Sequence, residues 1–540
     1  MKIAIAQLNP TIGDFEKNYQ TALTAIQKAK SESSNLIIFP ELFLPGYPLL
    51  DLIFKHDFLE QQNKVLQKLT KETSQDFAII IGAVGSSKFS TSRFTNSAYC
   101  LANGKIEKVI NKTLLPSYDV FDETRYFSAN DDYDCTWKFQ EHKIGVSICE
   151  DAWIEAYPSI YSKNPIENLV AANADFIVNI SASPFTNKKI QRRKDLIGRI
   201  AKKYQSKFIY VNQTGANDQL VFDGSSFVCN ELGATIINCK SFQEEIKIFD
   251  IDKTQADKDQ QENSDIENIY NACVLGIKDY IEKTGFTKVV LGLSGGIDSA
   301  IVACLAVQAL GAKNVCGIMM PTLYTSSDSI KDAKALAEIL GINYQVKEIN
   351  SLYQETKNLF DNQLQGLADE NIQPRIRANI LMAYANANNA ILLATGNKSE
   401  IAVGYSTLYG DSCGAIAPIG DLLKTQVYEL ANFINTKKTI ISKNIITKAP
   451  SAELRPDQKD SDSLPDYEIL DQIINLYIDE LKSLQEIIEL GFDQEITHKT
   501  LSMIDRAEYK RMQMPPIIKI ANRAFGIGRR MPIAQRFSHA

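Results

Sequence analysis

The segment KVVLGLSGGIDSAIVACLAVQALG, residues 288–311, decides the fold of the second half of the chain. A β-branched apolar run ends in a loop of glycine and serine residues, and apolar residues then recur at Ile297, Ile301 and Leu305 until Gly311. This order predicts a strand, an anion-binding loop and a helix. The loop lacks the lysine of a Walker A motif and places Asp298 at the expected start of the helix. Any phosphate-binding function of this loop must therefore explain why an acidic residue lies beside the phosphate.

Strand-like runs continue on both sides of this segment. After it, further strands of a Rossmann-like parallel sheet are predicted at NVCGIMMPT, YQVKEINS and AILLATGN. The first half alternates strand-like runs, from KIAIAQL to SFVCNELGATI, with helical stretches, which predicts a layered α/β domain. Residues 252–265, DKTQADKDQQENSD, have almost no apolar content and are typical of a linker. We therefore expect domains at 1–251 and 266–540, joined by a linker at 252–265.

Composition limits the classes of function. The chain has 540 residues, 44% of them hydrophobic, and no apolar run near the roughly 20 residues that a membrane span needs. The N-terminal residues lack the pattern of a signal peptide, so we expect a soluble, cytoplasmic protein. A net charge of −7 disfavours a nucleic-acid partner and favours small-molecule substrates. The nine cysteines form no C-x-x-C pair, so the sequence indicates neither a disulfide framework nor a zinc site.

The SGGIDS loop resembles that of the ATP pyrophosphatases. The resemblance implies a loop that holds pyrophosphate, with Asp298 binding Mg²⁺ against it. It also implies cleavage of ATP between the α- and β-phosphates, so that a carboxyl or carbonyl oxygen is adenylated and a nitrogen or sulfur nucleophile then displaces AMP. The expected ATP-binding residues of the loop are Gly292, Leu293, Ser294, Gly295, Gly296, Ile297, Asp298 and Ser299.

Four later motifs narrow the resemblance to the NAD synthetase family: ENIQPRIRAN (370–379), LLATGNKSEIAVGYSTLYGD (392–411), APIGDLLKTQVYEL (417–430) and AEYKRMQMPP (507–516). Each charged residue in them, taken alone, is equally consistent with a solvated surface. Together they imply ATP contacts at Thr395, Lys424 and Ser451, and a magnesium site at Asp298 and Glu400. They imply contacts to deamido-NAD⁺ at Asn371, Arg375, Glu400 and Lys510. The chain departs from ammonia-dependent members, which carry a lysine and an acid where Leu408 and Ala415 stand.

Three chemically suggestive segments lie in the first half: IIFPELFLPGYP (37–48), VINKTLLPSYDVFDETRYF (109–127) and KIGVSICEDAW (143–153). Glu41, Lys112 and Cys149 each follow a strand-like run, so we expect them at the ends of strands, where sites of α/β proteins gather. A carboxylate can take the proton of a thiol, the thiolate can attack an amide carbonyl, and an ammonium can stabilise the resulting oxyanion.

These three residues look like the Glu, Lys, Cys triad of the nitrilase superfamily, a resemblance that covers roughly residues 1–250 and implies an α-β-β-α layered fold. The resemblance makes Glu41 the general base, Lys112 the oxyanion stabiliser and Cys149 the nucleophile. Glu123 is expected to orient the site. Contacts to glutamine are implied at Tyr118, Ser183 and Lys189.

A cysteine–histidine pair is the alternative for Cys149. His142 is the nearest histidine in sequence. Seven residues along one extended strand span roughly 23 Å, so a pair between His142 and Cys149 is disfavoured.

The two halves together resemble the glutamine-using members of the NAD synthetase family. They imply a ligase that amidates deamido-NAD⁺ to NAD⁺ with ATP, Mg²⁺ and ammonia from L-glutamine, and a homo-oligomer. An amidotransferase acting on another carboxylate or on a nucleotide carbonyl is the nearest alternative. A sulfur transferase and a nucleotide-responsive binding protein on an inactive scaffold are the others.

Overall fold

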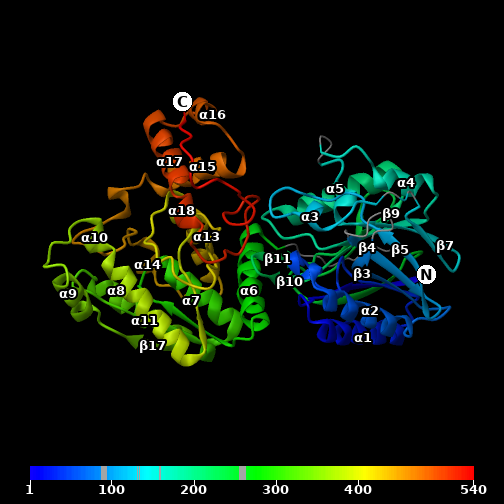
Figure 1. Cartoon of the computed structure of the whole chain (residues 1–540), viewed down its shortest axis with the longest axis horizontal. Helices are drawn as coiled ribbons and strands as arrows, with labels where there is room; N and C mark the ends of the chain where they lie inside the picture. The colour runs from blue at the N-terminus through cyan, green and yellow to red at the C-terminus, as the bar shows by residue number, and fades with distance from the viewer. Residues whose placement is uncertain (87–93, 131, 133, 157–159, 254–262, 540) are drawn as a thin grey trace. The chain divides into compact units, whose positions relative to one another are not determined.

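The computed structural model describes residues 1–539 except 87–93, 131, 133, 157–159 and 254–262 (Figure 1). The chain divides into two compact units, Met1–Asn263 and Ser264–Ala540. The predicted domain boundaries stay predictions, because most of the linker at 252–265 lies outside the described residues. None of the helices described is both long and apolar enough to cross a membrane.

Unit 1 contains two six-stranded sheets. The strand order of the first is β14 (Glu245–Asp250), β1 (Lys2–Gln7), β2 (Leu36–Ile38), β3 (Ala78–Ser86), β4 (Phe94–Ala102) and β5 (Lys105–Asn111). The order of the second is β13 (Thr235–Asn238), β12 (Phe227–Cys229), β9 (Lys207–Asn212), β8 (Phe176–Ser181), β7 (His142–Ile148) and β6 (Thr136–Phe139). Parallel pairs form the centre of each sheet, and antiparallel strands complete both edges.

Alternation along β1 shows how the layers form. Ile3 and Ile5 enter an apolar core shared with β7 and β8 of the second sheet, whereas Ala4 and Ala6 pack with helix residues on the opposite face. The outer helices are α1 (Phe15–Ser31) and α2 (His56–Thr70) on the first sheet, and α4 (Pro165–Ala171) and α5 (Lys189–Tyr204) on the second. The predicted α-β-β-α layering is confirmed.

Several short elements of unit 1 have weaker sequence signals. A separate hairpin pairs β10 (Thr214–Asn217) with β11 (Leu220–Asp223). Strand β14 pairs antiparallel with β1 and so closes the unit just before the predicted linker. The remaining helical turns are η1 (Leu50–Phe54), α3 (Glu123–Tyr126) and η2 (Cys149–Ala152).

Unit 2 is built on a parallel sheet, as predicted. Its strand order is β17 (Asn343–Val346), β16 (Val315–Met319), β15 (Lys288–Gly292) and β18 (Ala390–Leu392). Strand β15 pairs with β16 on one side and with β18 on the other, so the chain changes direction across the sheet at β15. Ligand sites of open α/β sheets form at such a switch point, outside the carboxyl ends of the strands. The quoted loop begins at this end of β15.

Helices cover this sheet and extend the unit beyond it. Helix α7 (Ile297–Leu310) follows the loop, is buried along most of its length, and packs against α6 (Asp265–Lys283) and α13 (Lys424–Ile434). The other elements are η3 (Ala312–Asn314), α8 (Ser327–Leu340), α9 (Asn350–Asn358), α10 (Leu367–Glu370), α11 (Ile372–Asn388), α12 (Lys398–Val403), α14 (Lys443–Thr447), η4 (Asp460–Asp462), α15 (Tyr467–Ile474), η5 (Asn475–Asp479), α16 (Leu484–Glu489), α17 (Gln494–Arg506) and α18 (Glu508–Arg511).

Candidate active sites

Glu41, Lys112 and Cys149 come together in unit 1. Lys112 directly follows β5, Cys149 directly follows β7, and Glu41 lies three residues after β2. Lys112 has no exposed surface, and its Nζ donates to Glu41 Oε1 at 2.7 Å and to Glu123 Oε1 at 2.8 Å. The structure therefore joins the predicted base, the predicted oxyanion stabiliser and the predicted orienting acid by direct contacts.

A tight turn against β3 fixes Glu41. A side-chain Cβ on Gly82 of β3 would lie 2.2 Å from the backbone nitrogen of Leu42, so only glycine fits beneath this turn. The carboxylate then accepts hydrogen bonds from Asn96 Nδ2 at 2.6 Å and from the backbone N–H of Ala182 at 2.7 Å. Together with Lys112, these donors hold Glu41 in a single orientation.

Electrostatics set the resting state of Cys149, the predicted nucleophile. Burial raises the pKa of the Cys149 thiol well above its usual value, Glu41 raises it further, and Lys112 opposes them. Burial by itself would lower the pKa of Lys112, but Glu123 and Glu41 raise it well above the usual range. Cys149 is therefore a thiol that needs a base, and Lys112 remains an ammonium.

Asp151 connects the segments that carry Lys112 and Cys149. Its Oδ1 accepts from the backbone N–H groups of Thr113 and Leu114 at 3.0 and 2.8 Å, directly after Lys112. Its Oδ2 accepts from the N–H of Ile148 at 3.0 Å, directly before Cys149. One buried carboxylate thus fixes the spacing between the chain beside Lys112 and the chain beside Cys149.

Glu150 is a buried acid that the sequence interpretation missed. Its Oε1 accepts from Tyr118 Oη at 2.8 Å and from Tyr161 Oη at 2.9 Å. Burial raises its pKa, while Lys112, Tyr118, Tyr161 and Lys189 lower it. Two of the predicted glutamine contacts, Tyr118 and Lys189, therefore gather around Glu150. The available signal was the acid directly after the cysteine in ICEDAW.

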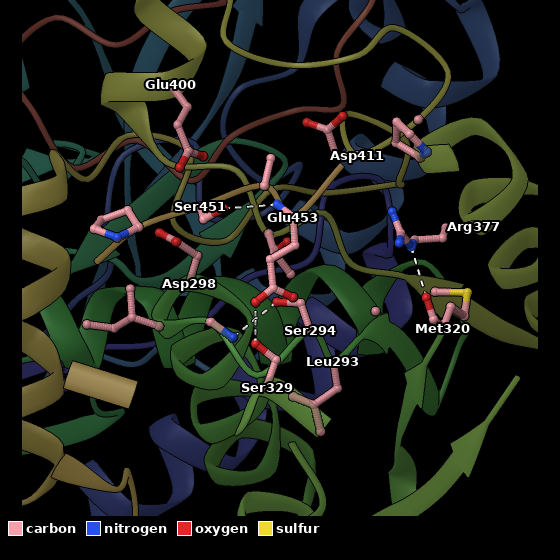
Figure 2. Close-up of a pocket in the computed structure, with 18 of the residues that line it drawn as sticks. Leu293, Ser294, Asp298, Met320, Ser329, Arg377, Glu400, Asp411, Ser451 and Glu453 are labelled. Atoms are coloured by element: carbon pink, nitrogen blue, oxygen red, sulfur yellow. Dashed lines mark hydrogen bonds between the residues drawn. The ribbon is translucent and has the colours of Figure 1, made fainter. Parts of the chain in front are cut away.

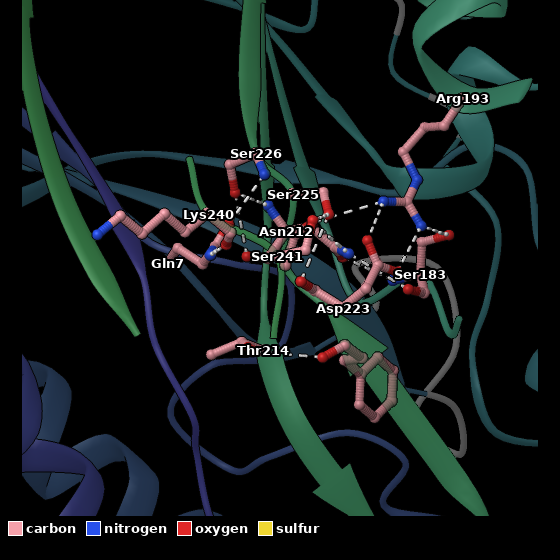
Figure 3. A network of polar contacts seen from close by, with 12 residues as sticks. Gln7, Ser183, Arg193, Asn212, Thr214, Asp223, Ser225, Ser226, Lys240 and Ser241 are labelled. Carbon is pink, nitrogen blue, oxygen red and sulfur yellow. Dashed lines mark hydrogen bonds and ion pairs between the residues drawn. The ribbon is translucent and has the colours of Figure 1, made fainter. Parts of the chain in front are cut away.

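The third predicted glutamine contact, Ser183, belongs to a buried polar network (Figure 3). The N–H of Ser183 donates to Asn212 Oδ1 at 2.8 Å, and its hydroxyl lies 3.5 Å from Arg193 Nη2. Arg193 of α5 makes a two-pronged ion pair with Asp223 at 3.0 and 3.1 Å, and neither side chain is exposed by more than 1%. This pair fixes α5 against β11, and Arg193 also lies within hydrogen-bond distance of Ser183.

Replacing Arg193 by Ala should destabilise unit 1 strongly. The change leaves Asp223 buried without its ionic partner, which typically costs about 3–5 kcal/mol of unfolding free energy. Chemical denaturation of the purified protein measures the loss, with Arg192→Ala on the exposed face of the same helix as the control. A loss no larger than that of the control would contradict the role given to the pair.

Unit 2 contains a cavity of about 300 Å³ at the carboxyl ends of β15, β16 and β18 (Figure 2). Its lining includes these residues expected from the sequence: Gly292, Leu293, Ser294, Gly296, Ile297, Asp298, Thr395, Glu400, Lys424 and Ser451. Residues more than 150 positions apart in the chain thus form one cavity.

Two loop residues have structural positions behind the cavity. Within the described part of the chain, Gly295 and Ser299 are not among the lining residues. Gly295 has φ +79°, and a Cβ there would lie 2.2 Å from the carbonyl oxygen of Ser329, so the loop packs directly on α8. Ser299 Oγ accepts from the N–H of Ser294 at 3.2 Å and closes the turn.

Asp298 and Glu400 face one another across Lys424. Lys424 Nζ donates to Asp298 Oδ2 at 2.6 Å and to Glu400 Oε1 at 3.4 Å. Burial raises the pKa of Glu400 to about 8, with Lys424 lowering it and Asp298 raising it. Two carboxylates that share one ammonium provide the hard oxygen ligands that Mg²⁺ prefers. The residues present therefore fit the predicted metal.

Asn371, Arg375 and Lys510 lie beside the cavity; none of the three is among its described lining residues. They meet instead on the segment 404–408, which precedes the cavity residue Asp411. The contacts are Thr407 Oγ1 to Asn371 Oδ1 at 2.7 Å, Arg375 Nε to the Leu408 carbonyl at 3.2 Å, and Lys510 Nζ to the Gly404 and Ser406 carbonyls at 2.7 and 2.8 Å.

Several charged residues of the cavity were not predicted. Arg377 lines it and donates from Nε to the Met320 carbonyl at 3.0 Å, and burial lowers the pKa of Arg377 to about 10 (Figure 2). Asp411, Lys448 and Glu453 also line it. Sequence reasoning chose Arg375 over Arg377, and nothing in PRIRAN itself distinguishes the two arginines.

Comparison with known proteins identifies the family. Residues 2–260 match the carbon-nitrogen hydrolase family and residues 269–515 match the NAD synthase family. The chain is 44% identical to the glutamine-dependent NAD(+) synthetase of Synechocystis sp., with 99% of both chains covered. The chain belongs to the glutamine-dependent NAD(+) synthetase family. The family member from Thermotoga maritima is 40% identical, again with 99% of both chains covered.

Solved structures of the family have the same architecture. The glutamine-dependent NAD⁺ synthetase of Acinetobacter baumannii, solved in complex with ADP, is 37% identical with a TM-score of 0.78 and 98% coverage of both chains. The structure of the glutamine-dependent NAD(+) synthetase from Cytophaga hutchinsonii has a TM-score of 0.84 at 21% identity, with 99% of this chain and 98% of that chain covered, and supports the fold alone.

Proposed function

We propose that the chain catalyses deamido-NAD⁺ + ATP + L-glutamine + H₂O → NAD⁺ + AMP + pyrophosphate + L-glutamate. The observation that carries this proposal is the buried contact of Lys112 with Glu41 and Glu123 beside Cys149, in a chain that also holds the SGGIDS cavity. The residues around Cys149 suit amide hydrolysis, and the SGGIDS cavity suits adenylation. Family membership and the ADP bound to the relative from A. baumannii support the same assignment.

Unit 1 releases ammonia in this proposal. Glu41 takes the proton from Cys149 Sγ, and the thiolate attacks the amide carbon of glutamine. Lys112 stabilises the oxyanion, and Glu41 passes the proton to the leaving nitrogen. Ammonia departs and leaves a thioester on Cys149. Glu41 then deprotonates a water molecule that hydrolyses the thioester, which releases glutamate and restores the thiol.

Unit 2 activates the acceptor. A carboxylate oxygen of deamido-NAD⁺ attacks the α-phosphorus of ATP, and pyrophosphate leaves towards the backbone N–H groups of the loop and the start of α7. Ammonia then attacks the acyl carbon and AMP departs with its oxygen. Asp298 and Glu400 would hold Mg²⁺, which offsets the negative charge of the phosphates when bound.

Glu150 is proposed to bind the α-ammonium group of glutamine. It is buried and accepts hydrogen bonds from the hydroxyls of two tyrosines. One of them is Tyr118, a predicted glutamine contact. Replacing Glu150 by Gln should raise KM for glutamine at least about 10-fold, because a charge-assisted hydrogen bond is lost. The rate with ammonium salts should not change. Glu141→Gln, on an exposed acid, is the control; equal KM values in the two variants would contradict the role.

One assay tests the reaction as a whole. The purified protein is incubated with ATP, Mg²⁺, glutamine and deamido-NAD⁺, and AMP, pyrophosphate and NAD⁺ are measured. We expect equimolar AMP and NAD⁺. Formation of ADP would exclude the adenylation chemistry. AMP formation only with another carboxylate would favour the amidotransferase alternative. The homo-oligomeric state and the cytoplasmic location stay predictions from the sequence.

A further inference from the structure

The cation that a Walker A lysine would supply is missing from the loop itself. The sequence motifs predict Lys424 as an ATP contact, but its ammonium already makes ion pairs with Asp298 at 2.6 Å and Glu400 at 3.4 Å. Arg377 donates to the Met320 carbonyl at the end of β16. Neither cation contacts the backbone of the glycine loop in the described structure.

Lys448 does contact it. This residue follows α14, lines the cavity, and donates from Nζ to the carbonyl oxygen of Gly295 at 3.3 Å and to Ser329 Oγ at 2.7 Å. Both acceptors are neutral. Among the residues that the structure describes, Lys448 has no carboxylate within ion-pair distance. An ammonium is therefore held at the loop by groups that orient it without neutralising its charge.

Ser329 connects three segments at this point. Its hydroxyl lies 2.8 Å from Glu453 Oε1 (Figure 2). The same hydroxyl lies 2.7 Å from Lys448 Nζ, and the Ser329 carbonyl packs against Gly295. Glu453 also accepts from Ser326 Oγ at 2.9 Å, which ties its carboxylate to the start of α8. The segment 448–454 is thus anchored on α8, and Lys448 is the basic residue that this segment brings to the glycine loop.

We propose that Lys448 supplies the missing phosphate-binding cation: it contacts the β- and γ-phosphates of ATP and the pyrophosphate that leaves. The proposal rests on the adenylation reaction assigned to unit 2. The carbonyl of Gly295 and the hydroxyl of Ser329 position its ammonium, which a phosphate oxygen would then meet together with the loop N–H groups. In a Walker A motif one segment provides both the loop and its lysine; here the lysine comes from a segment about 150 residues away.

Product inhibition tests this role directly. Lys448→Gln is compared with the parent protein in NAD⁺ synthesis from ammonium salts at saturating Mg²⁺, which bypasses glutamine hydrolysis. We expect the inhibition constant for pyrophosphate and KM for ATP to rise about 10-fold or more, since a charge-assisted contact is lost. The inhibition constant for AMP should change less than about 3-fold, because AMP lacks the β- and γ-phosphates. Lys448→Arg should recover most of the pyrophosphate affinity.

Controls separate this role from a structural one. Lys443→Gln removes an exposed lysine of α14 and should leave both inhibition constants unchanged. If Lys448→Gln weakened AMP and pyrophosphate equally, or weakened neither, the proposal would be overturned. If the parent protein formed no AMP at all, the proposed function would fail instead, so the two failures are distinguishable.

Discussion

Cys149→Ala should abolish NAD⁺ synthesis from glutamine while leaving synthesis from ammonium salts within about 2-fold of the parent rate. Removal of a catalytic nucleophile typically lowers kcat by about 10³-fold or more. Glu41 and Lys112 remain, yet neither can form the covalent intermediate. NAD⁺ formation is measured with each nitrogen source in turn.

Cys135→Ala is the matched control for the loss of a thiol. Cys135 is half-buried, and it contacts Asn130 rather than Glu41 or Lys112. It should retain synthesis from both nitrogen sources. The nucleophile assignment would be wrong if Cys149→Ala still used glutamine. The structure does not support a cysteine–histidine mechanism with His142. His142 begins β7, and Cys149 follows the other end of that strand.

Asp298→Ala should abolish synthesis from glutamine and from ammonium salts alike, by about 10²-fold or more, because the charged residue proposed to bind the metal next to the phosphates is lost. Lys424 would also lose its 2.6 Å partner in the cavity. Glutamine hydrolysis by unit 1, measured as glutamate release without ATP, should persist at the parent rate. This retained activity shows that unit 1 is folded, and a thermal unfolding midpoint like that of the parent protein checks unit 2.

The matched control for that variant is Asp328→Ala. Asp328 is an exposed acid in the first turn of α8 and pairs with Lys331. It should leave synthesis unchanged. An Asp298→Ala protein that made NAD⁺ from ammonium salts at the parent rate would contradict the metal and phosphate assignments together.

Much of the fold followed from local patterns. Glu41, Lys112 and Cys149 lie at strand ends because apolar runs precede each of them, and such runs are strong signals for buried strands. The β15 loop and α7 were also predictable, since glycine and serine residues separate a strand run from a helical period. Strand β14, EIKIFD, was missed; its partner β1 is more than 230 residues earlier in the chain.

The cavity was harder to predict because its contacts join distant segments. The pairing of Lys448 with Ser329, of Arg377 with Met320 and of Lys424 with Asp298 depends on how the helices pack, and no local spacing encodes these contacts. The resemblance gave Lys424 but not Lys448 or Arg377. The adjacent acids Glu150 and Asp151 are both buried, and only their hydrogen-bond partners distinguish them: Glu150 accepts from two tyrosines and Asp151 from backbone N–H groups.

Gly82 has no reactive group, yet the turn that carries Glu41 depends on it. The smallest change, Gly82→Ala, would place a methyl group 2.2 Å from the chain that carries Glu41, and the turn would have to move. The position of Glu41 therefore requires a residue without a side chain in the middle of an apolar strand. The placement of the predicted base thus depends on a residue that offers no side-chain atom to a substrate.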